Sequence, residues 1–128
     1  MEFMAKLRFA RLAPRKMRYV ADLIRGFNIN RALETLKVVP NRGSYYLNKL
    51  LRSAIANASN RDENVDVDTL TIKSLRVDPG PALKRIRYGP MGRTLPIRKE
   101  TCHVHVILEP EPEEEEQEGK RRKRRSAV

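Results

Sequence analysis

The feature that most constrains this chain is the segment from Asp78 to Glu100, which cannot form a helix. Its sequence, DPGPALKRIRYGPMGRTLPIRKE, contains four prolines and three glycines. Proline removes a backbone donor and clashes inside a helix, and glycine weakens one. Alternating apolar residues precede and follow the segment, so we expect its two halves to continue the flanking strands. The segment is therefore predicted to form an extended β-hairpin over about residues 78–100, with its tip at Gly89–Gly92.

The basic side chains of this hairpin indicate what holds it in place. No acidic residue lies between Lys84 and Lys99. Two arms of about eleven residues, at roughly 3.3 Å each, would carry the tip about 35 Å from the body. A two-stranded ribbon is only marginally stable alone in water. We therefore expect an anionic partner to bind the six cations of the hairpin, which are Lys84, Arg85, Arg87, Arg93, Arg98 and Lys99.

The charge of the whole chain favours nucleic acid as that partner. The sequence has 27 Lys and Arg against 16 Asp and Glu, a net charge of +11. Residues 1–108 carry 21 of these bases and nine of the acids, so the basic part is the part able to fold. A domain this basic is typical of proteins that bind a polyanion. A membrane partner is not expected, because no basic amphipathic helix with aromatic anchors is present.

Apolar periodicity predicts an α+β body, with three helices packed on a small antiparallel sheet of about three strands, from which the long hairpin projects. The clearest helical pattern is formed by Leu47, Leu50, Leu51, Ala54, Ile55 and Ala58. Helices are expected from Pro14 to Gly26, from Asn28 or Asn30 to Pro40, and from about Asn41 or Ser44 to Asn60.

The predicted strands frame the hairpin and the N-terminus. One strand is expected within residues 2–12. Leu70 and Ile72 alternate in the opposite phase to Leu75 and Val77, which predicts a β-bulge near Lys73 and Ser74. A further strand from Cys102 to Leu108 has one fully apolar face.

The chain is predicted to be one domain, residues 1–108, followed by a low-complexity tail at residues 109–128. The tail is acidic in EPEPEEEEQEG and basic in KRRKRR, so it is expected to be disordered or to associate with RNA. Read alone, KRRKRR would also fit an import signal. The longest apolar runs are too short for a transmembrane helix and the N-terminus lacks a signal peptide, so a soluble, unsecreted protein is expected.

A second group of bases lies near the N-terminus and is also predicted to bind phosphates. An ordinary solvated helix face is the alternative explanation for such a run of charge. The group consists of Lys6, Arg8, Arg11, Arg15, Lys16 and Arg18.

The sequence offers no convincing catalytic or metal site. His103 and His105 share one strand face, but a third ligand with suitable spacing is absent. Cys102 alternates with valines, as a small core residue does. No nucleophile motif or phosphate-binding glycine loop occurs, so neither an enzymatic activity, a cofactor nor a metal ion is expected.

Five separated strings resemble the bacterial L-twenty-two family of large-subunit ribosomal proteins. The resemblance covers roughly residues 5–108, with Ala13 and the Gly89–Pro90 pair departing from the usual family pattern. The strings are RLAPRKMRYVADLIRG (Arg11–Gly26), RALETLKVVP (Arg31–Pro40), LLRSAIANASN (Leu50–Asn60), VDPGPALKRIR (Val77–Arg87) and MGRTLPIRKETCHVHVIL (Met91–Leu108).

The resemblance implies a structural constituent of the large ribosomal subunit. Its β-hairpin would penetrate the large-subunit rRNA, and the protein would bridge several rRNA domains and act early in assembly. Its partners would be rRNA, neighbouring ribosomal proteins and the nascent peptide, and no homo-oligomer is expected. The protein would be located in the ribosomes of a bacterial cytoplasm or of an organelle. The hairpin tip would line the peptide exit tunnel with Tyr88, Gly89, Pro90, Met91, Gly92 and Arg93.

Two other classes compete with this interpretation. A free RNA- or DNA-binding regulator would stay in solution away from large RNA particles, so sedimentation with large subunits distinguishes it. A small RNA-modifying enzyme would need a catalytic constellation that the sequence does not contain.

Overall fold

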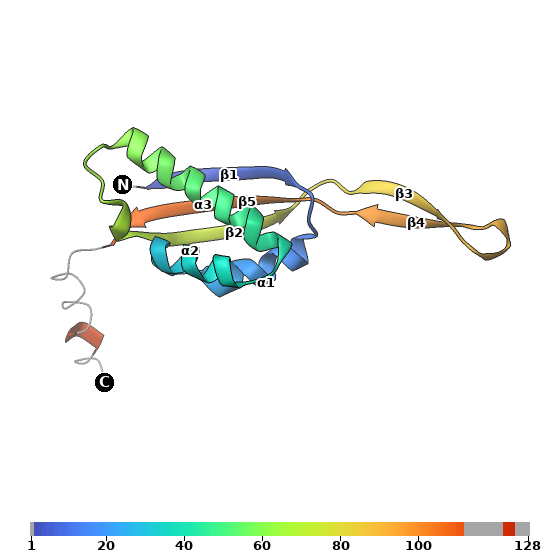
Figure 1. The fold of residues 1–128 in the computed structure, drawn as a ribbon, viewed down its shortest axis with the longest axis horizontal. Coiled ribbons are helices and arrows are strands. Elements are labelled where there is room, and N and C mark those ends of the chain that lie inside the picture. Colours follow the sequence, from blue (N-terminus) through green and yellow to red (C-terminus); the bar gives the residue numbers. More distant parts are fainter. Residues whose placement is uncertain (1, 112–121, 125–128) are drawn as a thin grey trace.

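The structure, a computed structural model, describes residues 2–111 and 122–124. A three-stranded antiparallel sheet has the order β1 (Phe3–Ala10), β5 (Cys102–Pro110) and β2 (Leu70–Pro79). The helices α1 (Pro14–Ile24), α2 (Ile29–Val38) and α3 (Arg42–Arg61) lie together over one face of this sheet (Figure 1). The predicted α+β class is confirmed. Residues 122–124 form a further single helical turn beyond the three predicted helices.

The central strand, β5, pairs with both edge strands and carries the apolar face predicted for it. Cys102, Val104, Val106 and Leu108 are buried, while the residues between them are partly exposed. The register between β2 and β5 shifts between Ile72 and Ser74, so the predicted bulge is confirmed. The strand runs to Pro110, two residues beyond the predicted end of the domain, and most of the predicted tail lies outside the described residues.

The helix boundaries follow from local chemistry. Pro14 occupies the first turn of α1, where its missing N–H costs nothing, and Ala13 makes no side-chain cap. Asn28, rather than Asn30, caps α2: its side-chain oxygen accepts a hydrogen bond from the Asn30 N–H at 2.9 Å. Between α3 and the sheet, a 3₁₀ turn at Val67–Thr69 leads into β2.

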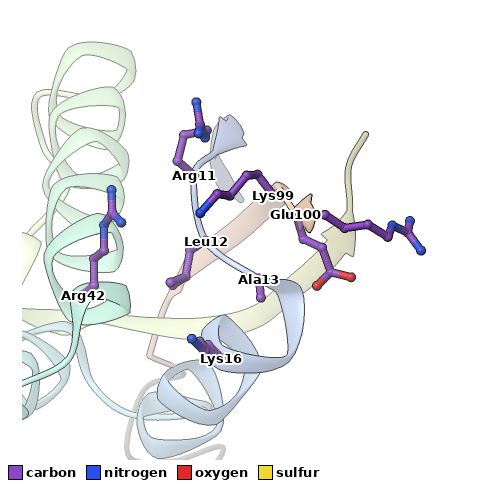
Figure 2. A pocket seen from close by; sticks show the side chains of 8 residues that line it. Arg11, Leu12, Ala13, Lys16, Arg42, Lys99 and Glu100 are labelled. Carbon is purple, nitrogen blue, oxygen red and sulfur yellow. The ribbon is translucent and has the colours of Figure 1, made fainter. Parts of the chain in front are cut away.

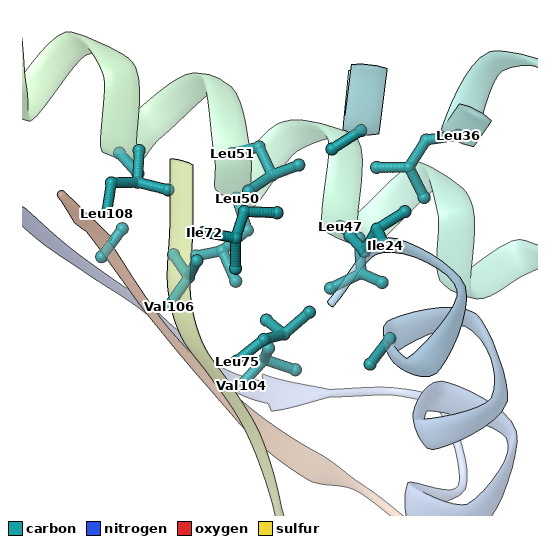
Figure 3. Packing of buried hydrophobic residues seen from close by; sticks show 14 of the residues in the cluster. Ile24, Leu36, Leu47, Leu50, Leu51, Ile72, Leu75, Val104, Val106 and Leu108 are labelled. Carbon is teal, nitrogen blue, oxygen red and sulfur yellow. The ribbon is translucent and has the colours of Figure 1, made fainter. Parts of the chain in front are cut away.

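The core lies between the sheet and the three helices (Figure 3). The buried stripes of α1 and α3 repeat every three to four residues, as the helical period requires. Ile55, the one large member of the predicted α3 pattern outside the core proper, is partly buried against it. The fully buried large side chains include Met17, Ile24, Leu47, Leu51, Leu70, Leu75, Val104, Val106 and Leu108.

Arg18 on α1 and Arg25, the residue directly after this helix, attach α1 to the edge strand β2. Arg18 donates a hydrogen bond to the Val77 carbonyl at 3.2 Å, and Arg25 donates to the Leu75 carbonyl. An edge strand leaves backbone carbonyls without ladder partners, and these guanidinium groups satisfy two of them. Arg18 therefore has a structural contact in addition to its predicted role with RNA.

A separate two-stranded ribbon extends from the body beyond β2 and β5 (Figure 1). It consists of β3 (Leu83–Tyr88) and β4 (Thr94–Lys99), joined by a 3₁₀ turn at Pro90–Gly92. Pairing stops between the body and the ribbon, because Pro79 pairs with Cys102 and the next pair is Leu83 with Lys99. The arms are thus shorter than the predicted continuous eleven residues.

The interruption at the base of the ribbon has a physical cause. Pro81 has no N–H to donate, and its carbonyl accepts a hydrogen bond from the Thr101 hydroxyl at 2.6 Å. The Gly80 N–H donates to the Thr101 carbonyl at 2.9 Å. A Cβ atom on Gly80 would lie 2.6 Å from the Thr101 Oγ1, so only glycine allows this close approach. This Gly80–Pro81–Thr101 contact fixes the base of the ribbon.

Candidate nucleic-acid interface

The ribbon carries cations on both of its faces. Residues directly opposite each other in an antiparallel pair share a face, and successive pairs alternate. Lys84 therefore lies on one face with its partner Arg98, whereas Arg85 and Arg87 lie on the other, where they pair with Ile97 and Leu95. Like charges directly opposite each other are unfavourable in a free ribbon. An anion bound near Lys84 and Arg98 would remove that repulsion.

Large apolar side chains of the ribbon are also exposed. Met91 is 97% exposed, Tyr88 is 89% exposed and Ile86 is 74% exposed. Met91 and Gly92, at the tip, have φ angles of 58° and 71° and turn the chain back toward β4. None of the described residues of the body covers these side chains, so the ribbon combines charge with apolar surface that a partner can bury.

A basic pocket lies where the ribbon meets the body (Figure 2). Its volume is about 510 Å³. The loop before α1 contributes Arg11 and Lys16 lies on that helix, so two of the predicted N-terminal cations meet two of the predicted hairpin cations here. We call this the hinge pocket; it is lined by Arg11, Leu12, Ala13, Lys16, Arg42, Arg98, Lys99 and Glu100.

The charge of the hinge pocket suits a phosphate group. Five of its lining side chains are cationic and one, Glu100, is acidic. The first turn of α1 begins at the pocket without a side-chain cap, so its free N–H groups add a positive partial charge. Arg42 lines the hinge pocket but was not predicted from the sequence as a binding residue. It stands alone at the start of α3, far along the chain from the other cations, and only the tertiary fold brings it to them.

The other N-terminal cations do not join this pocket. Lys6 and Arg8 lie on β1, on the sheet face that no helix of residues 2–111 covers. Arg15 is exposed on α1 and its Nε donates to the Tyr19 hydroxyl at 3.3 Å. The single N-terminal cluster expected from the sequence is therefore divided among the hinge pocket, the open sheet face and the exposed side of α1, while Arg18 contacts β2.

The two histidines and the single cysteine of the chain lie on β5, where burial and nearby charges affect Cys102 and His105. Among the residues that the structure describes, no three His, Cys, Asp or Glu side chains could hold a metal ion. Burial raises the pKa of the Cys102 thiol, an effect that the charge of Arg18 opposes to a smaller extent. Burial also lowers the pKa of His105, as does the charge of Arg76, while Asp78 acts in the opposite direction. None of the described helices could cross a membrane.

The chain is similar over most of its length to known bacterial proteins. The sequence profile described as ribosomal protein L22p/L17e matches residues 5–109. The "Large ribosomal subunit protein uL22" of Trichlorobacter lovleyi is 51% identical over 108 residues, which are 84% of this chain and 95% of that protein. The protein of the same name from Myxococcus xanthus is 47% identical over 109 residues, 84% of this chain and 96% of its own length. The chain therefore belongs to the ribosomal protein L22p/L17e family.

Proposed function

We propose that this chain is a structural constituent of the large ribosomal subunit that binds large-subunit rRNA through its ribbon and its hinge pocket. As a member of a ribosomal-protein family it is a structural protein and not an enzyme. The bacterial relatives favour the ribosome of a bacterial cytoplasm as its location. Neighbouring proteins of the subunit are its further partners.

The observation that carries this proposal is a ribbon with cations on both faces and no core of its own. A protein that lay on a flat RNA surface would need cations on one face only. Cations on both faces fit a ribbon surrounded by phosphates. The planar guanidinium groups of Arg85 and Arg87 can bind two phosphate oxygens each or stack on bases, which suits densely packed RNA.

The tip of the ribbon is proposed to line the peptide exit tunnel. Tyr88, Met91 and Arg93 are exposed there, and Met91 lies within the turn that begins after Gly89 and runs from Pro90 to Gly92. A tip that contacts a moving nascent peptide cannot be buried in RNA on all sides. The exposed side chains of Tyr88 and Met91 are available for contact with such a peptide.

The same arrangement supports a role in bridging rRNA domains and in early assembly. The ribbon extends away from the body (Figure 1). The hinge pocket, Arg15 and the open sheet face are at the body itself. RNA segments bound at these separate places would be held at a fixed distance. A monomer suffices for this task, so no homo-oligomer is proposed.

The first test is sedimentation of the chain with large subunits, followed by reconstruction of those subunits. We expect the chain to remain bound after a moderate salt wash, with density for Lys84 to Lys99 reaching the tunnel wall. A chain that remains in the supernatant would instead support a free nucleic-acid-binding regulator.

A triple replacement, Lys84→Ala, Arg85→Ala and Arg87→Ala, tests the ribbon in solution. We expect affinity for large-subunit rRNA to fall at least about ten-fold at moderate salt, because three phosphate contacts are lost. The slope of log affinity against log salt should decrease by about 2 to 3, at roughly 0.7 to 0.9 per contact.

The matched control removes three exposed cations from the helices, by Arg31→Ala, Lys37→Ala and Arg52→Ala. This variant loses the same net charge at positions outside both the ribbon and the hinge pocket. If both triple variants reduce affinity and salt slope equally, binding depends on net charge alone and the ribbon has no special role.

A further inference from the structure

Phe9 has a backbone conformation that its side chain does not favour. Its φ angle is 58°, in the left-handed region that bulky residues rarely adopt. The cause is a bulge in β1: Leu7 pairs with Val104 and Ala10 pairs with Cys102, so Arg8 and Phe9 together stand opposite His103. A strained non-glycine residue of this kind persists only where its surroundings hold it, and such residues gather at functional sites.

His103 is the residue that holds this conformation. Its Nδ1 accepts a hydrogen bond from the Phe9 N–H at 3.0 Å. The two rings are in edge contact, with centroids 4.8 Å apart and an interplanar angle of 87°. The Phe9 ring nevertheless remains 54% exposed. The strained backbone of the bulge therefore places an aromatic ring in solvent. This ring adds little to the packing of the core.

One cation contacts the exposed ring, and a basic hollow borders the neighbours of Phe9. The Arg8 guanidinium carbon lies 5.4 Å from the centroid of the Phe9 ring. A hollow of about 300 Å³ beside them is lined by Lys6, Arg8, His103 and His105. It lies on the open face of the sheet and shares no residue with the hinge pocket. The acidic neighbour, Asp78, is already paired with Arg76 at 3.1 Å and lies 3.4 Å from His105.

We propose that Phe9 is a stacking platform for one unpaired RNA base, with Lys6 and Arg8 binding the phosphates beside it. An exposed aromatic ring beside a cation, at the border of a basic hollow on an open sheet, is a combination with which proteins recognise single-stranded RNA. A purely apolar partner would leave Lys6 and Arg8 without counter-charge. The inference rests on the proposed RNA binding and adds a site that is independent of the ribbon and of the hinge pocket.

The first arm of the test is Phe9→Gly, measured with single-stranded oligoadenylate of about ten nucleotides. Glycine adopts a positive φ freely, so the variant should unfold at the same temperature as the parent chain or higher. Its affinity for the oligoadenylate should fall at least about five-fold, within the range that one base–aromatic stack contributes. Tyr45→Ala removes another exposed aromatic ring, on α3, and should leave the affinity unchanged.

The second arm uses tryptophan as a local reporter, because the chain contains none. In Phe9→Trp, the indole fluorescence should be quenched when oligoadenylate stacks on it, and affinity should match that of the parent chain. In Tyr45→Trp, the same oligonucleotide should leave the fluorescence unchanged.

Stacking is supported if Phe9→Gly loses affinity and the tryptophan at position 9 is quenched. Unchanged affinity of Phe9→Gly, or an unquenched tryptophan at saturating oligoadenylate, overturns it. The ribbon triple variant separates this failure from a wider one. If the ribbon variant loses affinity for rRNA while Phe9→Gly keeps its affinity for oligoadenylate, the proposed function is supported and the stacking site is refuted. If the parent chain itself fails to bind rRNA, both fall.

Discussion

His105 is a partly buried histidine on the central strand, and its environment disfavours the charged imidazolium. Burial is the largest cause of its lowered pKa, and the nearby charge of Arg76 adds to the effect. A lowered pKa favours the neutral side chain at pH 7, so His105 adds little charge to the hollow that it lines with Lys6 and Arg8.

This leads to a prediction about pH. The pKa of His105 in the folded chain should be found below its usual value of 6.5. As pH falls below 6.5, the unfolded chain takes up this proton first, so the free energy of unfolding should decrease and then level off below the folded pKa. The shift of the His105 ring protons with pH, followed by NMR, measures the pKa directly. A folded pKa at or above 6.5 would contradict the prediction, and His105→Gln should abolish the change in stability over this window.

At the residue scale, the sequence predicted which side chains are buried better than it predicted contacts between residues that are far apart in the chain. Cys102 and Met17 lie in the core as their periodicity indicated. Arg42 could not be assigned to the hinge pocket, because its approach to Arg11 and Lys99 depends on how α3 crosses the other elements. The positive φ angle of Phe9 could not be predicted from the sequence either, because it results from the register between β1 and β5.

The elements themselves follow closely from local patterns. The helical periodicity around Leu47 and the change of phase near Lys73 both correspond to the observed α3 and the observed bulge. The interruption between body and ribbon did not follow, because it depends on Thr101, which is remote in sequence from Gly80 and Pro81.

The base of the ribbon can be tested with Gly80→Ala. The new Cβ would lie 2.6 Å from the Thr101 Oγ1 and 3.2 Å from the His103 Nε2. Overpacking of this kind costs about 1–3 kcal/mol, so the midpoint of urea unfolding should decrease.

The companion variant Thr101→Ala removes the oxygen that the new methyl group would meet. Gly80→Ala should therefore destabilise the chain less in the Thr101→Ala background than in the parent. Additive effects in this double-mutant cycle would show that the two residues do not contact each other as described.

On the scale of the whole molecule, the buried core and the proposed binding surfaces are largely separate. The buried core draws on every strand of the three-stranded sheet and on all three helices, but on no residue from 81 to 100. Global charge and the proline-rich segment predicted this division from the sequence. What they could not give was the position of the hinge pocket, to which both parts contribute.

The division predicts that the body folds without the ribbon. Residues 84–98 can be replaced by Asn-Gly, because Leu83 and Lys99 are already paired and this dipeptide favours a tight hairpin turn. The melting temperature should change by less than about 5 °C, equivalent to roughly 1 kcal/mol in a domain of this size. Affinity for large-subunit rRNA should decrease at least as much as in the ribbon triple variant. A shortened chain that lacks a cooperative thermal transition would refute the separation.

The two-stranded ribbon also has a consequence for the chain before it reaches RNA. Each of its strands has one edge without a partner among the described residues, and open edges of this kind promote aggregation between molecules. Pro96 removes one backbone donor from β4, and the cations of the ribbon repel those of a second copy. Salt weakens this repulsion, with a screening length of about 10 Å at 0.1 M. The charges that we propose to bind phosphates would thus also keep free chains dispersed, and high salt or a surplus of chains over rRNA would raise the risk of precipitation.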